Sequence, residues 1–590
     1  MNKRLIIFSL PFLFPLLLLA QFRNYQLNLT KDNISWYWEG NLNLNYQTGL
    51  QNRFFFENRF TSNLFRQRYD EKKWKDENNL QTWWEHRFND YYATSTRLRS
   101  HIFSDQNSFV KFSKHLFLQQ FSYFPVPNVK LTPGAGWASE DIYSYRDQGW
   151  YTELNLDVDH YDIGGYVNST NTHSAYYFFP GRKNQEHKYY VAFNRQFSKI
   201  ASDSIRVGYE YLSNSYHLAQ GDFLENVEVN ARFLYNELNY ITSDRSALKI
   251  ETRLQNRDVS QSNPSLLNHR RELTFANRIG WRYAGPKFES GIDLVNSQVT
   301  NLSSRLPGMG SESRNDVEGL QAALNLFTNW RISPSDEARL TFSYTKYEYS
   351  SPDTTQTIDE DDLRFITDLR YIHIFSPYFA LKLNFNMYLY HQIYIHASRS
   401  ANNNWNRILQ LAPSFRFTIP GVLEHTNQIK ILANYTIYDF EEILPQARSY
   451  IYRKLIYSDS LSLRLSDGLR LVTIYQLEKE DNGTFFKDIF AQQVSRELRS
   501  HFIDLSLVYL RIRNLKFVTG LNWYLRKEWG FAPVRRVARD YRAFSPRISV
   551  LYNIGSRILL HLTFAPKTYK DMDSPRVNYA TGQVNLRYLF

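Results

Sequence analysis

Two charged clusters contain the residues best suited to chemistry in this chain. An acidic run at 359–362 supplies oxygen ligands of the kind that bind divalent cations, although a solvated loop tip is the simpler interpretation. A basic cluster is the second candidate, because guanidinium groups make bidentate contacts with phosphates and carboxylates. We interpret it as a possible site for lipopolysaccharide phosphates or an anionic solute, with a generic basic surface as the equal alternative. Its members are Arg526, Lys527, Arg535, Arg536, Arg539 and Arg542.

The sequence contains none of the motifs that indicate an enzyme or a cofactor protein. H-E-x-x-H, G-x-S-x-G and a phosphate-binding glycine-rich loop are all missing, and the 14 His are scattered. The chain has no Cys, which excludes disulfides and thiolate metal sites. We therefore expect no catalytic residue, no cofactor and no metal. A Ser–His pair assembled by the fold stays open as a minor alternative.

The charge balance favours anionic partners. The net charge of +12 attracts anions, including anionic lipid headgroups and acidic saccharides. Nucleic acid is not expected as a partner, because no basic block or nucleic-acid-binding motif accompanies the charge.

The segments that position these residues alternate between apolar and polar side chains with a period of two. Residues 379–389 are typical: Leu383 and its odd-numbered neighbours are apolar, whereas Asn384 and most even-numbered neighbours are polar. The alternating runs reach about ten residues or more, enough to cross a bilayer at a tilt, whereas soluble sandwiches use strands of roughly five or six. We therefore expect Leu383 to face lipid and Asn384 to face an aqueous interior.

The composition agrees with membrane-spanning strands. The chain has 43 Tyr, 42 Phe and 12 Trp, and aromatic rings favour strands and membrane interfaces. The mean hydropathy of −0.50 is compatible with this interpretation, because half of each strand in a barrel faces a polar lumen.

Short and long connections alternate toward the C-terminal end. Tight turns are predicted at Asp467-Gly468, Arg513-Asn514 and Gly555-Ser556, and long loops at 479–493 and 526–541. A further long loop is predicted at 125–147, folded into the lumen or lying over its mouth. The count is about 26 strands, or 24 if residues 79–105 form one strand or none. The prediction is an all-β fold: a large transmembrane antiparallel up-and-down β-barrel.

The N-terminal residues 1–20 are predicted to be a secretory signal peptide. Lys3 and Arg4 precede an apolar run that ends before Ala20, and Pro11 and Pro15 argue against an anchoring helix. The remaining residues, 21–590, are expected to form the barrel without a second domain.

The last strand, 577–590, presents small or apolar residues at its even positions and ends on the aromatics Tyr588 and Phe590. It resembles the C-terminal signal strand of bacterial outer-membrane β-barrel proteins, whose final aromatic is read by the barrel-assembly machinery. The resemblance implies a Gram-negative outer-membrane location, with short periplasmic turns, long extracellular loops, and membrane lipid and lipopolysaccharide as surroundings. It extends to no subfamily: the strand pattern begins by Ile34, which leaves no room for the plug domain of TonB-dependent transporters.

Two functions follow from this architecture. The first is porin-like passage of solutes, saccharide or anionic in character. The alternative is a conduit or scaffold in an export or assembly complex for a polysaccharide, lipopolysaccharide or secreted protein. A barrel of about 26 strands leaks unless its loops or a periplasmic or plug partner close it.

Overall fold

The computed structural model describes residues 22–588 except 33, 50, 67–71, 144, 219–222, 264–265, 306–315, 352–358, 443–447, 532–533, 556 and 573. In this part of the chain, 28 strands form a single sheet. The predicted signal peptide and the terminal Phe590 lie outside the described residues. Among the described helical residues, none belongs to a helix of the length and hydropathy needed to cross a membrane.

The strands have the following bounds in chain order. The first fourteen are β1 (Phe22–Lys31), β2 (Ser35–Thr48), β3 (Asn52–Arg66), β4 (Lys72–Arg87), β5 (Tyr92–Asp105), β6 (Val110–Val126), β7 (Val129–Ile142), β8 (Tyr145–Ile163), β9 (Tyr166–Phe179), β10 (Arg182–Ser198), β11 (Ala201–His217), β12 (Leu224–Ser243), β13 (Ser246–Asn263) and β14 (Leu266–Ala284). The others are β15 (Phe288–Arg305), β16 (Val317–Ser333), β17 (Asp336–Ser350), β18 (Glu360–Ser376), β19 (Phe379–Tyr394), β20 (Asn404–Ile419), β21 (Leu423–Tyr438), β22 (Tyr450–Ser466), β23 (Leu469–Phe486), β24 (Ala491–Tyr509), β25 (Leu515–Phe531), β26 (Arg535–Ile554), β27 (Ile558–Asp571) and β28 (Val577–Tyr588). A short 3-10 helix, η1 (Ser400–Asn402), precedes β20.

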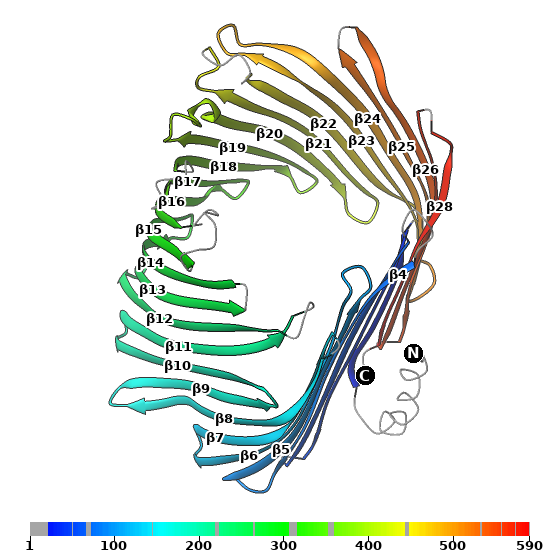
Figure 1. Ribbon diagram of the computed structural model, residues 1–590. Helices are drawn as coiled ribbons and strands as arrows, with labels where there is room; N and C mark the ends of the chain where they lie inside the picture. The colour runs from blue at the N-terminus through cyan, green and yellow to red at the C-terminus, as the bar shows by residue number, and fades with distance from the viewer. Residues whose placement is uncertain are drawn as a thin grey trace.

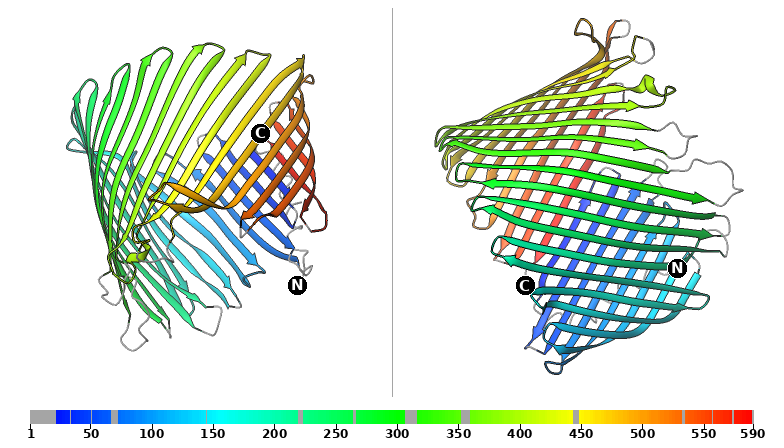
Figure 2. Two further views of the ribbon diagram at one scale, coloured as in Figure 1. Left: turned by 90° about the horizontal axis from the view of Figure 1, so that it is seen from above. Right: turned by 90° about the vertical axis from the view of Figure 1, so that its left-hand side faces the viewer.

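The sheet closes on itself. Each strand pairs antiparallel with the next, and β1 pairs antiparallel with β28 from Tyr25 opposite Tyr588 to Lys31 opposite Gly582. Closure removes the free edges that an open sheet of this size would expose. Figure 1 shows the resulting ring, and Figure 2 shows the strands of its near and far walls crossing at an angle, as tilted barrel strands do. The predicted all-β, antiparallel, up-and-down barrel is confirmed.

The two faces of the wall differ as the alternation predicts. Successive residues of β6 illustrate the contrast: the side chain of Phe117 is 50% exposed, whereas that of Leu118 is 2% exposed. Large apolar residues are exposed on the outer face of many strands, Leu383 of β19 among them. Such a continuous apolar exterior is stable only against lipid. The wall is therefore that of a membrane-spanning β-barrel, as the resemblance of the sequence to outer-membrane β-barrel proteins implies.

The ends of the barrel carry different connections. Because the number of strands is even, β1 begins and β28 ends on the same side of the barrel. Connections on this side are short, such as 334–335 and 467–468. The other side has the longer ones, such as 351–359 and 439–449. Gly468 has a φ of +90°, which the tight turn after Asp467 requires and glycine adopts without strain.

Three stretches predicted as loops are mostly strand. Residues 125–147 contain β7, and the predicted loops at 479–493 and 526–541 are largely covered by the ends of β23 to β26. These strands are polar near the rim because they extend beyond the apolar band into water. In β7 the absent N–H of Pro133 falls where the pairing with β6 is interrupted, between Leu131 and Gly134, so the proline is tolerated. With β4 and β5 both complete, the described wall has two strands more than the 26 predicted.

Candidate functional site

The inner face can be identified from one contact between strands that are not neighbours. Arg182 of β10 binds Glu140 of β7, and only side chains on the concave side of a curved wall can reach across two intervening strands. Glu140 shares its face with Ala138 and, across the pairing with β6, with Leu118, all of them buried. Trp137 and Phe117 project from the opposite, outer face.

The wall bends sharply around β6 to β9, and small residues on its inner face permit the bend. A Cβ added at Gly136 would lie 2.0 Å from the carbonyl oxygen of Phe117, and one at Gly149 would lie 1.8 Å from that of Phe178. The backbones therefore approach more closely on the concave side than any larger residue allows. Figure 1 shows the wall turning at this place, and Tyr151 and Phe179 are buried inside the turn.

A buried charge network joins the two arms of the bend. The Arg182 side chain is 1% exposed, and its guanidinium lies 2.6 Å from carboxylate oxygens of both Glu140 and Asp147. It also donates to the carbonyl oxygen of Ser215 at 2.6 Å and lies over the ring of Phe179 at 4.3 Å. A buried cation with two anionic partners, and with a hydrogen bond from each of its three guanidinium nitrogens, fixes the curvature of this part of the wall.

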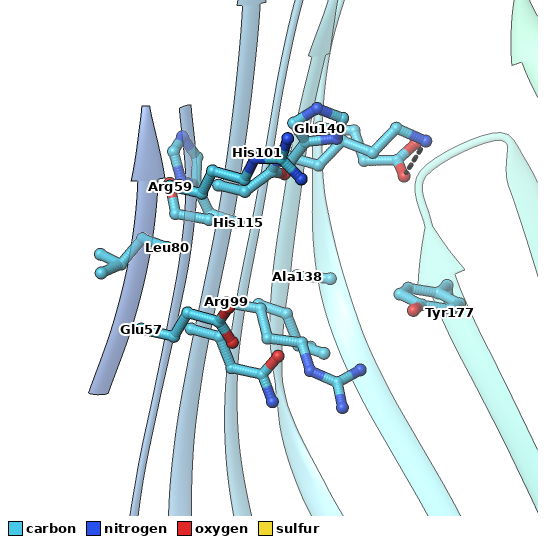
Figure 3. Close-up of a pocket in the computed structure, with 14 residues that line it drawn as sticks. Glu57, Arg59, Leu80, Arg99, His101, His115, Ala138, Glu140 and Tyr177 are labelled. Atoms are coloured by element: carbon cyan, nitrogen blue, oxygen red, sulfur yellow. Dashed lines mark hydrogen bonds and ion pairs between the residues drawn. The ribbon is translucent and has the colours of Figure 1, made fainter. Parts of the chain in front are cut away.

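A hollow of about 470 Å³ lies on the inner face beside this network. Two rows of side chains that run across β3 to β7 line it, and Tyr177 of β9 faces them (Figure 3). One row contains Glu57, Gln81, Arg99, Leu116 and Ala138, and the other contains Arg59, Asn79, His101, Lys114 and Glu140.

The hollow contains both hydrogen-bond donors and acceptors. Lys114 Nζ lies 3.1 Å from Glu140 and His101 Nε2 lies 3.1 Å from Glu77, so donors and acceptors are interleaved. A second hollow of about 480 Å³ extends from Lys114, Glu140 and Tyr177 toward Arg182. The two together form one polar surface along the inner wall.

Charge pairs continue around the inner wall. Lys249 contacts Glu251 at 2.7 Å and Glu237 at 3.3 Å, and Asp293 accepts from Arg278 and Arg282 at 2.9 and 2.7 Å. The opposite charges of Lys249 and Glu251 therefore form ion pairs along the wall rather than a surface of one sign.

The six basic residues predicted to form one cluster are divided between the two faces. Arg526 lies inside, 2.6 Å from buried Glu528, whereas its neighbour Lys527 lies outside, over the ring of Trp529. Cross-strand pairing and ion pairs extend the division to β26: Arg536 and Arg539 lie inside, and Arg535 and Arg542 lie outside. Because successive side chains of a strand point to opposite faces, a cluster along the sequence is divided between the two faces of the wall.

Other sequence-predicted residues are placed as follows. Asp362 of the acidic run lies 2.8 Å from Arg364, and Asp359 lies 3.3 Å from His396. Among the described residues, no group of three or more His, Asp or Glu is arranged to hold a metal. Tyr588 pairs with Tyr25 and Ile558 at the seam, and its role in assembly remains a prediction.

Sequence reasoning missed the bend and its hollow. The inner row Thr132, Gly134, Gly136, Ala138 and Glu140 does alternate with outer residues, and this was the available signal. The segment 125–147 was nevertheless predicted as a loop, because it contains three prolines and two glycines.

Comparisons with known proteins find solved outer-membrane structures at low similarity. No protein-family model matches the chain, and no curated protein does. The ferripyoverdine receptor of Pseudomonas aeruginosa aligns at 10% identity and a TM-score of 0.37, covering 97% of this chain and 72% of that one. The outer-membrane transporter YddB of Escherichia coli aligns at 8% identity and a TM-score of 0.36, covering 86% and 84%. The ferric citrate transporter FecA aligns at 11% identity and a TM-score of 0.36, covering 97% and 79%. The function is therefore inferred from the chain's own residues.

Proposed function

We propose that this protein is a wide outer-membrane channel for polar solutes. The observation that carries the proposal is a closed 28-strand wall whose outer face is apolar and whose inner face bears ion pairs. Barrel diameter grows roughly linearly with strand number, and 16–18 strands already leave an aqueous channel. Side chains that project from a wall of 28 strands cannot fill the lumen.

The inner wall supports a preference for saccharide or acidic solutes. Opposed charges along a pore set up a transverse field that orients polar molecules. In the hollow, the cations Arg59, Arg99 and Lys114 stand beside hydroxyl-binding acceptors and the ring of Tyr177. This combination binds carboxylated or hydroxyl-rich solutes better than apolar ones.

Planar-bilayer conductance of the purified full chain tests the proposal. We expect steady open-channel steps and a reversal potential that favours anions. Replacing Arg99 and Lys114 together with Gln should shift the reversal potential toward cations. Arg453→Gln with Arg499→Gln also removes two positive charges, but from the outer face, and should leave the reversal potential unchanged. A folded barrel that is silent in every bilayer would refute the open channel.

A conduit closed by a partner is the second candidate. It is favoured by one observation: in Figure 1, no described segment bridges the ring from one wall to the opposite one. If the described wall is all that lines the ring, a partner from outside the chain is needed to keep the membrane sealed. Silence in bilayers, together with a periplasmic protein that copurifies and whose removal restores conductance, would support the conduit over the channel.

A further inference from the structure

A row of like charges crosses three adjacent strands on the outer face of the barrel. Lys479 of β23 is directly opposite Arg499 of β24, and Arg499 is directly opposite Lys527 of β25. All three are exposed and belong to the odd-numbered outer face that also carries Leu505 and Leu521. Like charges in opposite positions destabilise a sheet, so this arrangement is unfavourable without a counter-ion.

Described carboxylates compensate this row poorly. Arg542 and Lys570 stand opposite one another beside the row and add two more cations. The one carboxylate among them, Asp540, is directly opposite Lys527 and lies 3.0 Å from Arg542, so one anion is shared between two cations. Other outer-face acids nearby are already paired, Glu497 with Arg535 and Asp481 with Arg453, both at 2.9 Å.

The row borders a groove. A hollow of about 430 Å³ lies between Trp523, Trp529, His501, the cations Arg499, Lys527 and Arg542, and the carboxylate of Asp540. Indole rings are enriched at the depth where hydrocarbon meets headgroups. The groove thus combines exposed cations with an aromatic floor.

The position of the groove along the strands indicates its depth in the membrane. It lies toward the ends of β23 to β27 that are remote from the chain termini, the side that carries the longer connections. Immediately toward the middle of the same strands, the outer face is apolar, with Leu505, Leu521 and Phe544 exposed. A molecule bound there would have acyl chains against these residues and its headgroup against the cations.

We propose that this groove binds the phosphorylated headgroup of an outer-leaflet glycolipid, with Lys479, Arg499, Lys527, Arg542 and Lys570 contacting its phosphates. A multiply charged phosphate neutralises opposed cations to which the described part of the protein offers a single shared carboxylate, Asp540. Arg526, Arg536 and Arg539 take no part, because they face the lumen. The site is independent of whether the barrel conducts.

Binding of bisphosphorylated lipid A to the purified full chain in detergent micelles tests the site. Each surface cation contributes roughly a fivefold gain in lipid affinity, so Arg499→Gln with Lys527→Gln should bind about thirtyfold more weakly. Arg536→Gln is the matched control, since it removes a cation from the same rim on the lumen face, and it should bind like the wild type. Folding of each variant is checked by heat-modifiable migration, and Lys479→Gln, with an expected loss of about fivefold, replaces the double variant if that one fails to fold.

Two competitors identify the ligand. Dephosphorylated lipid A with the same acyl chains should not displace the bound lipid, and inorganic phosphate at equal concentration should not either. Wild-type affinity in the double variant, or equal competition by the dephosphorylated lipid, would overturn the proposal. Equal competition by inorganic phosphate would show a free-anion site and overturn the assignment to lipid.

Discussion

The guanidinium of Arg182 lies 2.6 Å from a carboxylate oxygen of Glu140, although the two residues belong to strands separated by two others. The contact ties β10 to β7 across the concave side of the bend. Because the Arg182 side chain is almost completely buried, the pair is shielded from solvent. Its loss should therefore lower the free energy of unfolding more than the loss of an exposed pair.

We expect Arg182→Met to lower the free energy of unfolding by about 3–5 kcal/mol, because it leaves Glu140 and Asp147 buried without their cation. Urea titration of the barrel in lipid vesicles measures this. The control is Arg416→Met, which removes an exposed pair with Glu424 and should cost about 0–1 kcal/mol. Equal losses in the two variants would contradict the role given to the buried network.

The bend makes a separate prediction about glycine. Gly149→Val should abolish folding of the barrel, because its Cβ has no space beside the carbonyl oxygen of Phe178. Gly40→Val on the outer face should be tolerated, since nothing lies within 4 Å of an added Cβ there. The heat-modifiable fraction on a gel reports folding in both. A folded Gly149→Val barrel would mean that the wall can open at this point.

Face assignment is tested at two consecutive residues of β19. Phe385 is paired with Leu369 and Leu411 on the outer face, and Asn386 is paired with Asp368 and Gln410 on the inner face. Arg at position 385 should cost about 2–4 kcal/mol in vesicles, whereas Asn386→Arg should cost little, since water and Asp368 accommodate the charge. A similar cost at both positions would count against a lipid exterior and an aqueous interior.

The chain has no Cys, so single cysteines can report topology. Asp488→Cys, in the connection after β23, should react on intact cells with a maleimide on a polymer too large to cross the barrel. Asp467→Cys, in the tight turn before β23, should react only after the outer membrane is permeabilised. The opposite pattern would invert the assignment of extracellular and periplasmic ends.

Much of the wall could be predicted from the sequence because strand alternation and tight turns are local properties. Leu383 and Asn384 were assigned to opposite faces, and Asp467-Gly468 was identified as a turn, from nearest neighbours alone. The strand β7 was missed because Pro133 and two glycines imitate a loop, and their tolerance depends on the neighbouring strand. The contact of Arg182 with Glu140 was out of reach, because it depends on how sharply the wall curves.

The basic cluster shows a different limit. Arg526 and Lys527 are adjacent in sequence, and period two alone places them on opposite faces. The poorly compensated outer row of Lys479, Arg499 and Lys527 nevertheless depends on the register between strands, which the sequence does not specify.

Closure of the ring has a kinetic consequence. Lys31 Nζ donates to the carbonyl oxygen of Ala580 at 3.1 Å, a contact between residues 549 positions apart. Contacts of such separation carry a large loop-closure cost, and folding slows as the mean sequence separation of contacts rises. Until β28 has arrived, β1 presents an unpaired edge that invites aggregation. We therefore expect β1 to keep this edge unpaired until β28 reaches the membrane in which the ring is sealed.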